Sequence, residues 1–237
     1  MSTKWVHVLG GSIFLLGVFL GLGLALVAVW SDYEGFSYFN SGAGYPAFNS
    51  LVCPILMTRS EKGVVTADFK NSTGQEFEPY YEVAISGPVS SRKLEGQLSV
   101  SAHTTKTIQW TVDSNDIDLG FFIFVDMQVL PVAGYQTRED TCGIMVLDLT
   151  GPTGAQVFGL TLATSLLGMV LGLGLWENNN RLNINRYTNR HRALQVQGIA
   201  VLLALLTGLV GLWAVGLIFC VLAILLLVIN LRQSIES

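Results

Sequence analysis

The sequence predicts a membrane protein in which four transmembrane α-helices carry an all-β, immunoglobulin-like sandwich between the first and second helix. Only 13% of the 237 residues are charged, whereas an average soluble domain has about 25%. No Asp, Glu, Lys or Arg occurs in residues 5–30, 155–176 or 193–231. Residues 53–149, by contrast, alternate apolar and polar residues in short runs, which is the pattern of half-buried strands.

The same composition argues against several classes of protein. A chain with 51% hydrophobic residues is too apolar for a disordered protein. A net charge of −4 argues against a protein that binds nucleic acid through a basic surface. Long uncharged stretches of this kind also argue against a single soluble domain.

The first apolar segment, residues 5–30, is long enough to cross the bilayer, since a helix needs about 20 residues to span roughly 30 Å of hydrocarbon. A cleaved signal peptide is the alternative interpretation. Its apolar region would run only about 7–15 residues and would end in small residues. This segment ends in Trp30, so we expect an uncleaved anchor.

Residues 31–52 contain many aromatic residues but sustain neither a helix nor a strand period, so we expect an aromatic juxtamembrane loop. Aromatic rings favour the headgroup layer of a membrane, where such a loop would rest. They are also enriched in the cores of protein interfaces, so a docking surface for another protein is the second interpretation. The residues concerned are Tyr33, Phe36, Tyr38, Phe39, Tyr45 and Phe48.

Residues 53–149 predict an extracytoplasmic β-sandwich. About seven short strands are expected, and no strong helix pattern lies between them. Alternation gives each strand one apolar face, as two packed sheets require. The expected strands are 55–58, 64–70, 81–85, 94–100, 108–112, 121–129 and 144–149.

Two motifs in this region carry a resemblance. Val65-x-Ala67-x-Phe69-x-Asn71-x-Thr73 is followed, after another strand, by Thr107-x-x-Trp110-Thr111-Val112. Together they resemble bacterial and archaeal extracellular immunoglobulin-like domains over residues 53–149. The resemblance implies a binding or spacing module rather than an enzyme. Four spans with a β-rich first outer loop are also similar to the claudin arrangement, in topology only.

Three cysteines are present. Cys53 and Cys142 flank the expected sandwich, and Cys220 lies in the last apolar segment. Because an extracytoplasmic compartment is oxidising, we expect a Cys53–Cys142 disulfide. Two buried free thiols are the alternative.

Residues 155–176 predict the second span. The stretch 193–231 would be about 58 Å long as one helix, which overshoots a bilayer. A hairpin of two spans, 193–210 and 212–231, fits better, and a single helix is the alternative. The segment 177–192 is then expected to be a cytoplasmic loop.

Lys and Arg indicate the orientation, because cytoplasmic loops are enriched in them. Residues 177–192 contain four arginines, whereas residues 31–154 hold seven basic residues against fifteen acidic ones. We therefore expect a multi-pass protein of the plasma (cytoplasmic) membrane. Both termini and residues 177–192 would be cytoplasmic, and residues 31–154 extracytoplasmic.

Two apolar segments share a glycine motif. Residues 15–24 and 166–175 are identical at eight of ten positions, and each contains Gly-x-x-x-Gly. Such glycines share one helix face and let another backbone approach closely. We expect Gly17, Gly21, Gly168 and Gly172 to form a specific contact, either between the two helices or with a partner.

Few residues indicate chemistry. The acidic stretch 113–118 could bind Ca²⁺ or simply cap turns. Asn71-Ser72-Thr73 fits the glycosylation pattern. No metal or cofactor motif is recognised. In the expected spans only His7 and Asn230 come close to the ionisable groups that ion-coupled transport needs at membrane depth, and both lie near span ends.

The sequence therefore predicts a non-enzymatic integral membrane protein without cofactors. Its expected partners are membrane lipid and other membrane or cell-surface proteins, with a homo-oligomer left open and no nucleic acid. Adhesion, or an accessory or assembly role in a membrane complex, is the leading interpretation. A subunit of a transporter or channel and an extracytoplasmic ligand sensor are the alternatives.

Overall fold

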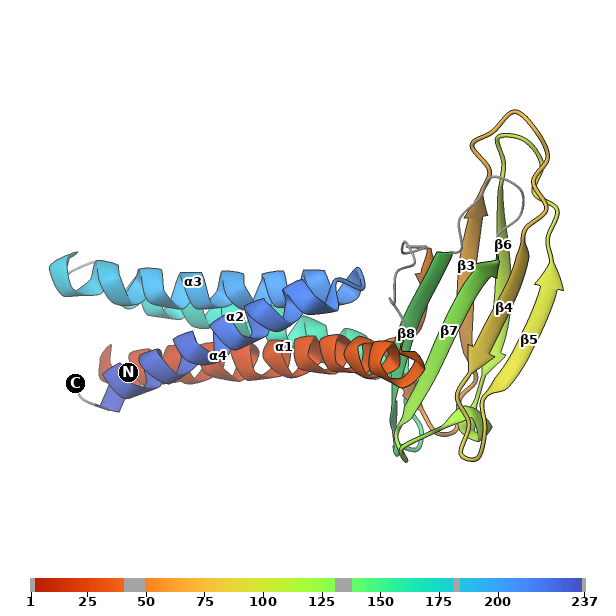
Figure 1. Cartoon of the computed structure of the whole chain (residues 1–237). Coiled ribbons are helices and arrows are strands. Elements are labelled where there is room, and N and C mark those ends of the chain that lie inside the picture. The colour runs from red at the N-terminus through yellow and green to blue at the C-terminus, as the bar shows by residue number, and fades with distance from the viewer. Residues whose placement is uncertain (1–2, 41–49, 131–137, 181–183, 236–237) are drawn as a thin grey trace. The chain divides into compact units, whose positions relative to one another are not determined.

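The computed structural model describes residues 3–40, 50–130, 138–180 and 184–235 (Figure 1). The chain divides into two compact units. We call residues 1–29 and 158–237 the helical unit, and residues 30–157 the sheet unit. The described helices are α1 (Thr3–Phe39), α2 (Gly154–Asn180), α3 (Ile184–Leu209) and α4 (Trp213–Ile235).

The sheet unit contains eight strands within its described residues. They are β1 (Leu51–Val52), β2 (Leu56–Thr58), β3 (Gly63–Lys70), β4 (Tyr80–Ile85), β5 (Arg92–Gln97), β6 (Thr105–Val112), β7 (Phe122–Leu130) and β8 (Arg138–Leu147). One sheet has the order β1-β3-β6, and the other has the order β2-β8-β7-β4-β5. Every named pair is antiparallel except β2 with β8. A short 3₁₀ helix, Ser114–Asp116, lies between β6 and β7.

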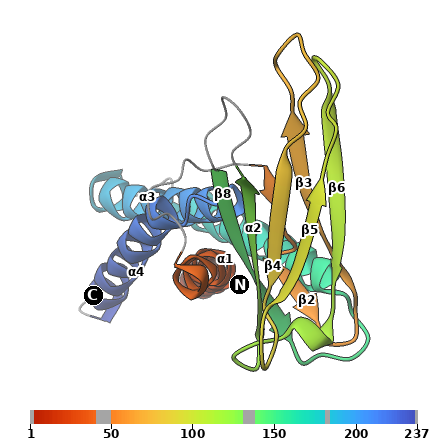
Figure 2. The same ribbon diagram turned by 45° about the vertical axis from the view of Figure 1, so that its right-hand side comes forward.

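One apolar core lies between the two sheets, which form two layers in Figures 1 and 2. β3 shows how the sequence builds it, because Val65, Ala67 and Phe69 are buried while the residues between them are more exposed. Strand residues alternate between the two faces of a sheet, so the period-two pattern puts one face inward. Trp110 and Val112 of β6 contribute to the same core.

Four helices are long and apolar enough to cross a membrane, among the residues that the structure describes. The candidate spans are Val8–Phe39, Gly154–Leu175, Arg192–Leu209 and Trp213–Arg232. The stretch 193–231 is thus divided into two helices rather than one. The turn between them is a Schellman motif, in which the Leu212 N–H donates to the Thr207 carbonyl at 2.9 Å and Gly211 has φ +73°.

The prediction of an irregular loop from residue 31 was wrong, because α1 continues as a helix to Phe39. Ser31, Gly35 and Tyr38 follow a helical spacing, and the first two are buried against β8. The buried face of these turns is made of small residues. A search for an apolar period therefore does not detect it.

The prediction of a loop over residues 177–192 was also wrong in large part. α2 continues to Asn180 and α3 begins at Ile184. The added turns contain arginines, which are good helix formers, but also several asparagines, which are not. Neither hydropathy nor helix propensity therefore marks these helix ends. Residues 181–183 lie outside the described residues.

Candidate functional site

The last turns of α1 lie directly against β8 within the sheet unit. Two glycines make this contact possible. A Cβ on Gly143 would lie 1.8 Å from the Ser31 carbonyl oxygen, and a Cβ on Gly35 would lie 3.0 Å from the Cys142 carbonyl oxygen. The helix backbone therefore touches the strand backbone, which any larger side chain at Gly143 would prevent.

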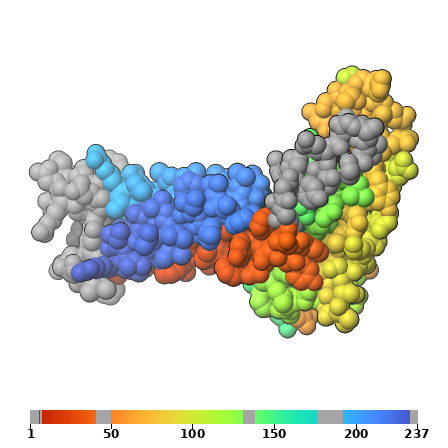
Figure 3. Space-filling model, in the orientation of Figure 1, coloured from red at the N-terminus to blue at the C-terminus, as the bar shows by residue number. Residues whose placement is uncertain are grey.

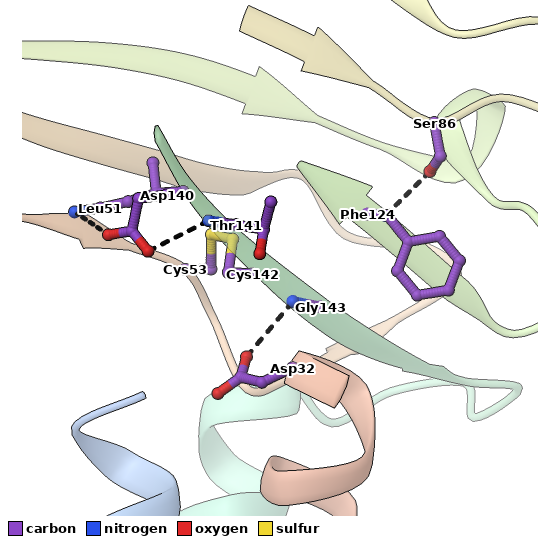
Figure 4. Close-up of a disulfide and its surroundings, with 9 residues drawn as sticks. All are labelled: Asp32, Leu51, Cys53, Ser86, Phe124, Asp140, Thr141, Cys142 and Gly143. Atoms are coloured by element: carbon purple, nitrogen blue, oxygen red, sulfur yellow. Dashed lines mark hydrogen bonds between the residues drawn. A yellow bond between two sulfur atoms is a disulfide. The ribbon is translucent and has the colours of Figure 1, made fainter. Parts of the chain in front are cut away.

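A carboxylate fixes this contact. The Gly143 N–H donates to Asp32 Oδ1 at 3.3 Å, and Figure 4 shows Asp32 reaching from the helix toward the strand. Two residues before Cys142 in the same strand, Asp140 accepts from the backbone N–H groups of Leu51 and Thr141, at 3.4 and 3.0 Å. The strand is thus bonded to α1 on one side and to β1 on the other.

The expected disulfide is present beside this contact. Cys53 and Cys142 are bonded across 89 residues of chain, with Cα atoms 6.4 Å apart (Figure 4). The bond ties β8 to the segment between β1 and β2. In the chain-entropy model, closing a loop of this size raises the free energy of unfolding by about 4–5 kcal/mol. Cys220 is a buried free thiol in α4.

Aromatic rings extend the contact between α1 and the sheet. Tyr38 lies 4.8 Å from Phe124, measured between ring centroids, and Phe124 stacks on Phe122 at 5.4 Å. The Phe124 N–H donates to Ser86 Oγ at 2.8 Å (Figure 4). β7 is buried on both faces, with its odd-numbered residues in the core and Phe124 in contact with Tyr38 of α1.

The aromatic residues expected to form an interface lie on the last turns of α1. Tyr33 and Tyr38 are each 38% exposed, and Phe36 and Phe39 are half-buried. We call these four residues the aromatic helix end. The ring centroids of Trp30 and Tyr33 are 5.7 Å apart, and those of Tyr38 and Phe39 are 4.9 Å apart. The other two expected residues, Tyr45 and Phe48, lie outside the described residues.

The four motif glycines lie within the helical unit, where α1 meets α2. A Cβ on Gly17 would lie 2.6 Å from the Met169 backbone nitrogen, and a Cβ on Gly172 would lie 2.5 Å from the Phe14 nitrogen. Gly168 faces Gly17, and Gly21 faces Ser165. Ser165 Oγ donates to the Gly17 carbonyl at 2.7 Å. The sequence left open whether these glycines contact each other's helix or a partner protein. In the structure they lie where α1 and α2 face each other.

Asn71 is almost fully buried and has a structural role. Its amide nitrogen donates to the carbonyls of Gln75, Val100 and Ser101, and its oxygen accepts from the backbone N–H of Thr73. These bonds leave the amide nitrogen enclosed, which is unsuitable for attachment of a glycan. The Asn-x-Thr motif instead closes the end of β3.

The acidic stretch 113–118 is also held by local bonds. Asp113 and Asp116 form a capping box around the 3₁₀ helix, and Arg92 forms a 2.9 Å ion pair with Asp116. These residues line a polar hollow of about 400 Å³. Among the described residues, no group of three or more His, Cys, Asp or Glu side chains is placed to hold a metal ion.

The β4–β5 edge carries paired charges. Lys93 contacts Glu82 at 2.5 Å, and this hydrogen bond raises the pKa of Lys93. Tyr80 donates to Glu95, whose carboxylate likewise raises the pKa of the Tyr80 hydroxyl. Exposed pairs of this kind contribute little to stability. They form a solvated edge rather than a catalytic pair.

Sequence reasoning missed a polar pair inside the helical unit. Gln197 of α3 is fully buried and accepts from Asn230 of α4 at 2.6 Å. The sequence shows two polar residues among apolar ones, but their pairing depends on how α3 and α4 pack. Among the residues that the structure describes, the Gln197 amide nitrogen has no hydrogen-bond partner.

No family model and no curated protein matches the chain. Among solved structures, 43% of the chain is similar to 14% of a cycloisomaltooligosaccharide glucanotransferase from Paenibacillus sp., at 13% identity and a TM-score of 0.34. A β-glucuronidase from Bacteroides uniformis matches over 40% of this chain and 12% of its own, at 9% identity and a TM-score of 0.32. A β-glucosidase from Erythrobacter marinus matches over 39% of this chain and 14% of its own, at 11% identity and a TM-score of 0.27. The chain thus matches about one seventh of these enzymes or less, and such TM-scores are too low to assign a shared fold or activity.

Proposed function

We propose that this chain is a non-enzymatic integral membrane protein that presents an extracytoplasmic immunoglobulin-like domain for contact with other membrane or cell-surface proteins. Its role would be adhesion, or accessory and assembly work in a membrane complex. The proposal has three parts: insertion, the domain type and the contact surface. Each is supported by a different observation.

Insertion is supported by the outward faces of the helices, and this observation carries the proposal. Large apolar side chains are exposed along them, including Val170 and Ile218, each 67% exposed. Side chains of α3 and α4 cover one face of the helical unit in Figure 3. Soluble monomers rarely expose apolar patches of more than a few hundred Å². Hydrocarbon is the solvent that these faces fit.

The immunoglobulin-like assignment is supported by strand order. Named in chain order as A, A′, B, C, C′, E, F and G, the strands give sheets A-B-E and A′-G-F-C-C′. Sandwiches of this class place B and E in one sheet and C, F and G in the other. Domains of this class bind or space other proteins, and their fold alone does not specify a reaction.

The contact surface is supported by the aromatic helix end. Tyr33 and Tyr38 remain over one third exposed, although Tyr38 lies beside the buried ring of Phe124. Tyr and Phe are enriched in interface cores, because each buries a large area at little cost in side-chain entropy. We therefore assign the aromatic helix end as the surface that meets a partner protein.

Site-specific photocrosslinking tests this function. A photoreactive residue at Tyr33 is expected to form an adduct with a membrane or cell-surface protein in intact cells. The matched control is the same residue at Val89, which is 95% exposed in the β4–β5 connection. Equal adducts at both positions, or none at Tyr33, would contradict the proposed surface.

A further inference from the structure

A groove lies between α2 and α3 in the helical unit. It has a volume of about 410 Å³, within the range of about 300–1,000 Å³ typical of ligand sites. Its walls are almost wholly apolar. They are formed by Leu166, Met169, Val170 and Leu173 of α2 and by Gln195, Gly198, Ile199 and Leu202 of α3.

A glycine leaves the groove open. A Cβ on Gly198 would have its nearest neighbours at 3.9 Å (Phe14) and 4.0 Å (Met169). No backbone atom of a neighbouring helix is among these nearest atoms, whereas at Gly17 and Gly172 the backbone of the other helix would clash with an added Cβ. A side chain at position 198 would fit, yet the groove is unfilled.

The two ends of the groove differ in charge. Along α3, the polar end at Gln195 lies one helical turn after Arg192, which is exposed. On α2, the acidic Glu177 follows the lining residue Leu173 by one turn, but residues 177–192 hold four arginines against this one acid, so the end is basic in net charge. The opposite end, at Leu202, continues into residues 203–212, which include no charged residue. In the proposed orientation Arg192 marks the cytoplasmic end of the candidate span Arg192–Leu209.

We propose that this groove holds an acyl chain of an anionic phospholipid from the cytoplasmic leaflet, with Arg192 at the lipid phosphate. The inference rests on the proposed membrane insertion. Basic residues at the cytoplasmic end of a groove between transmembrane helices are suited to anionic headgroups. The apolar walls of the groove match a long apolar chain. The cation at one end matches a negative charge at the end of that chain.

Lipid binding to the purified full-length protein in mild detergent tests the inference. Phosphatidylglycerol and phosphatidylcholine with identical acyl chains are titrated separately, and bound lipid is counted by native mass spectrometry. We expect one phosphatidylglycerol to bind at least fivefold more tightly than phosphatidylcholine. Arg192→Gln should abolish that preference, a fivefold change that corresponds to about 1 kcal/mol. Arg232→Gln, on α4, should keep it.

A second pair of variants tests the groove itself. Gly198→Leu fills the hollow and should prevent binding of both lipids, whereas Gly174→Leu points into open space and should not. Should Gly198→Leu fail to fold, Ile199→Trp narrows the groove from an exposed position. Equal binding of both lipids by all these variants would overturn the inference. It would also be overturned if the protein were a dimer that Gly198→Leu dissociates, because a second copy of the chain would then occupy the groove. Failure of the protein to remain in membranes after alkaline extraction would instead overturn the proposed function.

Discussion

At the scale of single residues, Gly143 has the least space of any described glycine, because a Cβ there would lie 1.8 Å from the Ser31 carbonyl oxygen. We predict that Gly143→Ala lowers the free energy of unfolding of the sheet unit by about 2–3 kcal/mol, as overpacking does. Calorimetry of the full-length protein in detergent measures the change. Gly74→Ala is the control, since its nearest neighbour would be 4.0 Å away. Equal unfolding temperatures for the two variants would contradict the contact between α1 and β8.

A second residue prediction concerns the buried amide of Asn71. Asn71→Ala leaves the carbonyls of Gln75, Val100 and Ser101 without this donor. Because unsatisfied buried polar groups are costly, we expect a loss of about 1–3 kcal/mol in the free energy of unfolding. Thermal unfolding of the full-length protein measures it. Asn115→Ala, at an exposed turn, should change the unfolding temperature by far less, and a similar effect of both substitutions would refute the bridging role.

Single residues also show what the sequence could and could not predict at the site. The glycines of α1 and α2 were detectable because Gly-x-x-x-Gly repeats in two similar strings. Gly35 and Gly143 carry no such signal, since each is a lone glycine in an ordinary context. Their importance depends on a contact between segments about 110 residues apart, as the bond from Gly143 to Asp32 illustrates.

At the scale of elements, the packing of α1 on α2 depends on glycines whose absent side chains let the backbones meet. We predict that Gly17→Leu separates the two helices, because its Cβ would lie 2.6 Å from a backbone nitrogen of α2. The variant is expected to unfold at a lower mole fraction of denaturing detergent. Its free energy of unfolding should fall by at least about 2 kcal/mol. Gly23→Leu is the control on the same helix, where nothing lies within 4 Å. Equal stability of the two variants would contradict the close packing of α1 on α2 at Gly17.

Strands were easier to predict than helix ends. β3 and β6 overlap the expected strands because each has one face in the core and one more exposed, which produces alternation. β4 also overlaps its expected strand, although Val83, Ala84 and Ile85 are all buried. β8 begins at Arg138, before the expected start at 144, because its first residues are polar and are recruited by pairing with β7. Helix ends follow backbone bonding and tertiary contacts, so apolar segments underestimate α1, α2 and α3.

At the scale of the whole chain, composition alone separates the two units. The long uncharged segments form most of each helix, and the alternating segment with most of the acidic residues forms the two sheets. This separation was predictable because long uncharged apolar segments favour helices, whereas short alternating segments favour strands. The groove between α2 and α3 was not predictable, since it depends on which faces of two helices meet and on an unfilled position at Gly198.

In the proposed topology the helices lie in the membrane and the sheet unit faces the cell exterior. Single-cysteine labelling in a Cys220→Ser background tests it most directly, because Cys53 and Cys142 are bonded to each other. A maleimide that cannot cross membranes is expected to label Val89→Cys in intact cells, and to label Arg232→Cys only after the cells are permeabilised. Labelling of Arg232→Cys in intact cells, with Val89→Cys protected until permeabilisation, would contradict the account.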